Sequence, residues 1–109
     1  MLLMVMKFNL KDHSGEGMGE IIVIASREGS ILGEFSPASC FATYAPLFKE
    51  FEQAANDQLL VEIDRLEGEI YKLGFYVVGP CPQGPRYEIE NLQIMERGIS
   101  FRLKGGGKI

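Results

Sequence analysis

The chain has 109 residues, of which 46% are hydrophobic and 24% are charged, and its formal net charge is −4 at pH 7. These values are typical of one folded globular domain and disfavour intrinsic disorder. The excess of acidic residues argues against binding to nucleic acid, because duplex-binding proteins need a basic face to displace counterions from phosphates.

The first ten residues, MLLMVMKFNL, form an apolar run that is too short to span a membrane. This run also lacks the basic start and the small-residue cleavage site of a signal peptide. The two cysteines, Cys40 and Cys81, are too few for a disulfide framework. We therefore expect a cytoplasmic protein with reduced thiols and no membrane contact.

The N-terminal third predicts three strands in an antiparallel meander. Residues 2–10 are rich in strand-forming side chains, and residues 20–26 form a continuous apolar run. Residues 31–36 alternate, so that Ile31, Gly33 and Phe35 share one face. The short REGS segment before this last strand predicts a hairpin turn in which Gly29 takes a positive φ.

The middle of the chain predicts two amphipathic helices. In the first helix we expect Thr43 to be the N-cap and Pro46 to lie in the first turn, where no hydrogen-bond donor is needed. Its apolar positions follow helical spacing and are Leu47, Phe48, Phe51, Ala54 and Ala55.

The second helix is predicted from a break at Asn56 and Asp57, with Asp57 as its cap, to a stop at Gly74. Its apolar stripe, spaced by three and four, is Leu59, Ile63, Leu66, Ile70 and Leu73. Gly68 lies inside this helix and weakens it by about 1 kcal/mol relative to alanine. Two alternatives stay open: the segment LLVEID could be a strand, or the two helices could be one long bent helix.

The C-terminal third predicts three more strands. Residues 75–79 form a short apolar strand, and the prolines of PCPQGP bar the next segment from sheet pairing. Residues 86–103 predict a hairpin with its tip at Glu96 and Arg97. In this register Ile94 lies opposite Ile99, Leu92 opposite Phe101, Gln93 opposite Ser100 and Asn91 opposite Arg102. A bulge at Gly98 could shift the register by one residue.

These elements predict an α+β fold with the order βββααβββ. We expect antiparallel sheet pairing, with both helices packed on one sheet face. Residues 1–104 form the single predicted domain, and residues 105–109, which are rich in glycine, form a flexible tail.

The stretch DHSGEGMGE, residues 12–20, holds the only histidine and is the segment most suggestive of chemistry. Its glycine spacing matches neither the phosphate-binding nor the dinucleotide-binding pattern, and its glutamates would repel phosphate. The candidate metal ligands are Asp12, His13, Glu16 and Glu20. Ser14 beside His13 is a weak candidate for nucleophilic catalysis. We favour a solvent-exposed, metal-free connecting loop.

The cysteines offer a second candidate for chemistry. Cys40 precedes a predicted helix start and could act as a nucleophile with His13 as its base. We favour instead a buried Cys40 that packs under the first helix, because cysteine is among the most buried residue types. Cys81 lies between two prolines with no base nearby, and the absence of a C-x-x-C pair excludes structural zinc on ligand count.

The charged residues of the second helix suggest a solvated surface. Acidic and basic side chains alternate there, as in weak helical ion pairs, and not as in an acid–base pair. The acidic members are Glu62, Asp64, Glu67 and Glu69.

The sequence therefore favours a non-enzymatic domain that needs no cofactor and acts by binding protein, as adaptors and toxin-neutralising proteins do. The partner could be another protein or a second copy. The uncharged strand LLMVM, residues 2–6, would form an unprotected sheet edge suited to a two-fold homodimer. Two alternatives are a small enzyme that uses Cys40 and His13, and a small-ligand binder with a pocket between helices and sheet.

Overall fold

A computed structural model describes residues 6–79, 85–96 and 98–104 of the chain. The described elements follow the predicted order, with a short 3-10 helix (η1) before the first α-helix. They are β1 (Lys7–Lys11), β2 (Gly17–Arg27), β3 (Ser30–Pro37), η1 (Ser39–Thr43), α1 (Ala45–Asn56), α2 (Leu60–Lys72), β4 (Tyr76–Val78), β5 (Arg86–Met95) and β6 (Gly98–Leu103).

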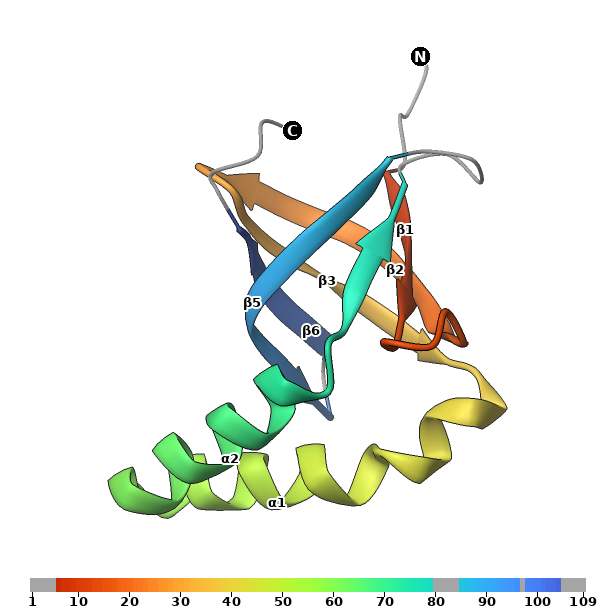
Figure 1. The fold of residues 1–109 in the computed structure, drawn as a ribbon. Helices are drawn as coiled ribbons and strands as arrows, with labels where there is room; N and C mark the ends of the chain where they lie inside the picture. The colour runs from red at the N-terminus through yellow and green to blue at the C-terminus, as the bar shows by residue number, and fades with distance from the viewer. Residues whose placement is uncertain (1–5, 80–84, 97, 105–109) are drawn as a thin grey trace.

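The six strands form one antiparallel sheet that closes into a barrel, in the order β1-β2-β3-β6-β5-β4. Closure comes from two pairings between strands distant in sequence: β1 with β4, and β3 with β6. The expectation that both helices cover one sheet face is therefore wrong, because the inner face is enclosed. The helices lie instead across one end of the barrel (Figure 1). Barrel closure also gives each described strand a neighbouring strand on both sides. The uncharged edge that we expected at residues 2–6 lies, except for Met6, outside the described residues.

The core lies inside the barrel and under the helices. Alternate residues of β1, β3 and β6 point inward, as the period of two requires, and edge-to-face aromatic contacts join distant strands. Phe8 of β1, for example, packs edge-on against Phe101 of β6, with the ring centroids 6.4 Å apart. The predicted inward face of β3 is confirmed, because Ile31 and Gly33 are buried and Phe35 is half-buried.

The two-helix prediction is confirmed, and the strand and single-helix alternatives are wrong. Gln58 between the helices has φ +57°, which ends the first helix. The predicted caps are also wrong. Thr43 belongs to η1 and Asp57 ends α1, whereas the residues that precede α1 and α2 are Tyr44 and Leu59, with no side-chain cap.

The end of the second helix is confirmed at Gly74. This residue has φ +67°, and its N–H donates to the carbonyl of Tyr71. The backbone also approaches closely here, because a Cβ atom at this position would lie 3.1 Å from the Cβ atom of His13. The loop after β1 therefore packs against the end of α2.

The C-terminal hairpin is confirmed, but its register is only partly as predicted. Ile94 pairs with Ile99 and Gln93 with Ser100, whereas Arg102 lies opposite Glu90 and not opposite Asn91. The difference is a bulge in which Asn91 and Leu92 together oppose Phe101. Asn91 has φ +55°, a conformation that asparagine tolerates better than most residues. The bulge thus lies in β5 and not at Gly98.

Four predictions fall wholly or partly on residues outside the described part of the chain, one of them the tip of the C-terminal hairpin at Glu96 and Arg97, of which residue 97 is not described. The other three are the start of the first strand at residues 2–5, the loop around Cys81 and the tail at residues 105–109.

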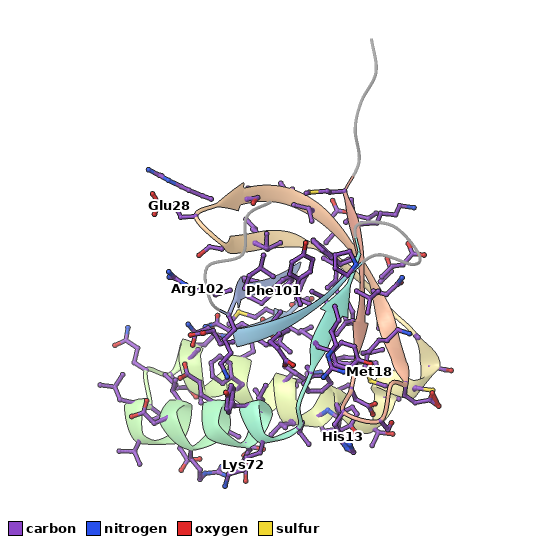
Figure 2. All side chains as sticks on the ribbon, turned by 45° about the horizontal axis from the view of Figure 1, so that its top comes forward. His13, Met18, Glu28, Lys72, Phe101 and Arg102 are labelled. Atoms are coloured by element: carbon purple, nitrogen blue, oxygen red, sulfur yellow. The ribbon has the colours of Figure 1, made fainter. Side chains whose placement is uncertain are left out.

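The turn between β2 and β3 offers a test of local backbone strain. Its two central residues, Glu28 and Gly29, have φ +51° and +85°, as a type I′ turn requires, and Figure 2 shows Glu28 at the far end from the helices. Glutamate is unfavourable in this conformation and asparagine is tolerated. We expect Glu28→Asn to raise the free energy of unfolding by up to about 1 kcal/mol in urea denaturation. Glu34→Asn in the extended part of β3 is the control and should give no gain.

Candidate functional site

The first part of the glycine-rich stretch, residues 12–16, is a loop built around Asp12, whereas residues 17–20, which we expected in the same loop, belong to β2. The Asp12 side chain is only 5% exposed, and its two carboxylate oxygens accept four hydrogen bonds. One oxygen accepts from the backbone N–H and the hydroxyl of Ser14 and from the N–H of Glu16, at 2.7 to 3.0 Å. The other oxygen accepts from the hydroxyl of Tyr44 at 3.1 Å. These bonds tie the loop to the segment that leads into α1.

The hydrogen bonds also shift the pKa values of Asp12 and Tyr44. The hydroxyl of Ser14 is the largest cause that lowers the pKa of Asp12; burial opposes it, and the N–H groups of Glu16 and Ser14 and the hydroxyl of Tyr44 lower the pKa further. Burial, followed by the hydrogen bond to Asp12 and its charge, raises the pKa of Tyr44. Asp12 therefore serves as the charged anchor of the loop.

The four candidate metal ligands are not brought together. Asp12 points into the molecule, whereas His13, Glu16 and Glu20 are exposed, and Figure 2 shows His13 at the helical end of the barrel. Glu20 lies in β2, where it is 3.8 Å from the ammonium group of Lys7. Among the described residues no three His, Cys, Asp or Glu side chains are arranged to hold a metal ion.

Cys40 is exposed, which contradicts our expectation of a buried thiol. The reason is local: η1 turns the neighbouring Phe41 into the core, where it is 6% exposed, and leaves Cys40 outside. Within the described residues, no hydrogen bond joins Cys40 or Ser14 to His13. The structure therefore assembles neither of the two nucleophile–base pairs that the sequence suggested.

The solvated face of α2 is confirmed. Arg65 contacts Glu62 at 2.7 Å and Glu69 at 3.3 Å on its own helix, and it reaches Glu50 of α1 at 3.2 Å. All four side chains are about half exposed, so these pairs join the two helices at the surface.

A groove of about 450 Å³ lies between α2 and β5. Buried apolar side chains line its floor, namely Ile70, Phe75, Ile89 and Leu92. Gly68 and three carboxylates, those of Asp64, Glu67 and Glu90, line its sides. The volume lies within the range of small-molecule pockets.

Lys104 and Tyr71 also line the groove and contact each other. The ammonium group of Lys104 donates a 2.8 Å hydrogen bond to the hydroxyl of Tyr71, and it lies 5.4 Å from the ring centroid of that residue. This hydrogen bond is the largest cause that raises the pKa of Lys104. The cation is thus already engaged by a neighbour inside the groove.

The turn between the helices carries an exposed aliphatic cluster, which we call the hairpin tip: Leu59, Leu60 and Val61. Their exposed fractions are 49%, 73% and 81%. Leu59 was expected in the buried stripe and is not, because the stripe reaches the core from Ile63, which is partly buried, onward. The sequence held a signal for this surface, since three consecutive apolar residues cannot all face one side of a helix. The tip projects beyond the barrel (Figure 1).

The charge of the molecule is concentrated on the same two helices. Residues 45–72, which we call the helical hairpin, hold seven acidic and three basic residues, whereas the rest of the chain holds eight of each. The helical hairpin therefore accounts for the net charge of −4.

No family model, curated protein or solved structure matches this chain. The described helices include none long and apolar enough to cross a membrane. The function must therefore be inferred from the hairpin tip, the charge of the two helices and the groove.

Proposed function

We propose that this chain is a non-enzymatic, cytoplasmic domain that binds a protein partner through its helical hairpin. The observation that carries the proposal is the hairpin tip, where Leu60 and Val61 are among the most exposed apolar side chains of the described residues. Exposed apolar clusters rimmed by polar residues mark interaction surfaces. Packing this cluster into a partner would remove its apolar surface from water, which is favourable for binding.

The partner that fits this surface has an apolar pocket with a basic rim. The helical hairpin has four more acidic than basic residues. A basic rim would steer the encounter and reward the correct orientation, because complementary charges raise association rates and penalise wrong partners.

A second copy of the chain is a less favourable partner for the hairpin tip than a different, basic protein. Two helical hairpins that met tip to tip would bring two surfaces of charge −4 together. The homodimer through residues 2–6 remains a prediction, because all of that segment except Met6 lies outside the described residues. We therefore propose a different, basic protein as the partner.

A capture experiment with matched variants tests the proposal. The full chain is immobilised and exposed to a lysate of the organism that encodes it. Leu60→Gln/Val61→Gln should reduce capture of a basic protein at least ten-fold, because both substitutions remove apolar area and keep helix propensity and charge. The control, Ile24→Thr/Leu32→Thr, removes two exposed apolar side chains from the barrel and should leave capture unchanged.

Salt provides a second readout of the same complex. The captured protein should be released by about 0.5 M NaCl, because screening at that ionic strength shortens the reach of the charges to a few ångströms. Equal capture by the tip variant and the barrel control would contradict the proposal, as would a captured protein that is acidic.

A further inference from the structure

The groove between α2 and β5 contains a glycine that the helix does not need. Gly68 has no positive φ, and a Cβ atom added to it would meet nothing within 4 Å. Glycine inside a helix is unfavourable relative to alanine. Its structural effect is to leave space, since any larger side chain at this position would project into the groove that Gly68 lines.

The floor of the groove suits an apolar body. The four floor residues, defined above, are each at most 6% exposed. The bulge at Asn91 bends β5 at the side of the groove opposite α2. A flat or compact apolar group of up to about ten heavy atoms fits the volume of about 450 Å³.

The sides of the groove select the charge of the occupant. Asp64 and Glu67 on α2 and Glu90 on β5 line it, and within the described residues none of the three forms an ion pair. Lys104 is the single cation in the lining, and it is hydrogen-bonded to Tyr71. The groove therefore carries a net negative charge over an apolar floor.

We propose that this groove binds a small organic cation, such as an amidinium or ammonium group on an apolar body. The apolar part packs on the floor, and the cation donates charge-assisted hydrogen bonds to the carboxylates of Asp64 and Glu67. The site is independent of the protein partner proposed above, because it requires only the chain itself. A small molecule bound in the groove would contact α2, the helix whose first residues belong to the hairpin tip.

The test is a titration of the full chain, without any partner, followed by ¹H–¹⁵N NMR. Three probes share one ring and differ in charge: benzamidine, benzamide and benzoate. Benzamidine should shift the backbone amides of Gly68, Tyr71 and Asn91 saturably, with a Kd of about 1 mM or tighter. Benzamide should bind at least ten-fold more weakly, and benzoate should give no saturable shift.

Two matched double variants test which carboxylates bind the cation of the probe. Asp64→Asn/Glu67→Gln should weaken benzamidine binding at least five-fold. Glu62→Gln/Glu69→Gln makes the same change in net charge on the same helix, but these residues face Arg65 and not the groove, so binding should be unchanged. Equal losses in the two variants would mean that net charge alone attracts the probe, which would overturn the proposal.

A third variant fills the part of the groove that Gly68 leaves open. Gly68→Leu should leave the thermal midpoint unchanged or raise it by a few degrees, because leucine favours helix, and it should abolish benzamidine binding. Retained binding in Gly68→Leu would overturn the proposal. So would shifts that map away from the groove, or benzamide binding as tight as that of benzamidine.

Discussion

Leu66→Ala should lower the free energy of unfolding by about 2–5 kcal/mol. The Leu66 side chain is fully buried, at 0% exposure, in the core that α2 shares with α1 and the barrel. Truncation removes the buried methyl groups and leaves a cavity that the closed barrel and the paired helices can fill only in part. Urea or guanidinium denaturation followed by circular dichroism measures the change.

The matched control for this prediction lies on the same helix. Leu60→Ala makes the same chemical change at a side chain that is 73% exposed, so the loss should stay within about 0.5 kcal/mol. Similar losses in both variants would mean that α2 does not pack as described. The control also shows that the hairpin tip can be altered without unfolding the domain.

Asp12→Ala should lower the free energy of unfolding by about 2 kcal/mol. The substitution leaves the hydroxyl of Tyr44 and the N–H groups of Ser14 and Glu16 without their acceptor. Asp64→Ala removes an exposed carboxylate and should cost at most about 0.5 kcal/mol. A loss for Asp12→Ala no larger than that of the control would contradict the anchoring role.

The same anchor predicts a pH dependence. The pKa of Asp12 in the folded protein lies below its ordinary value of 3.8, so its stabilising contribution is fully present above that value. The contribution is lost as the pH falls through the lower, folded-state pKa. The stability difference between the wild type and Asp12→Asn should therefore shrink as the pH is lowered from 5 to about 2. A difference that grows toward low pH would contradict the assignment.

The local parts of the fold were predictable because their signals lie within a few residues. The helix that ends at Gly74 follows from apolar spacing and a glycine that takes a positive φ, and the β2–β3 turn follows from Gly29. Barrel closure was not predictable in this way. It depends on the pairing of β1 with β4 and of β3 with β6, which no turn connects and which strand tilt and stagger decide together.

The candidate site was predictable only in part, for the same physical reason. Ser14 two residues after Asp12 is the spacing of a local turn, so the exposed loop could be expected. The contact of Asp12 with Tyr44 spans 32 residues and leaves no local trace. Gly68 was visible as a break in helix propensity, but the groove that it lines exists only because α2 and β5 lie side by side.

The most direct test of the proposed function is photo-crosslinking in cells of the encoding organism. A photoreactive phenylalanine analogue replaces Val61 at the hairpin tip or, as a control, Ile24 on the barrel, which is 60% exposed. We predict a discrete covalent adduct from position 61, formed with a basic protein, and none from position 24. Equal adducts from both positions would contradict the account. So would an adduct from position 61 with twice the 12.1 kDa mass of the chain, since that product is a second copy.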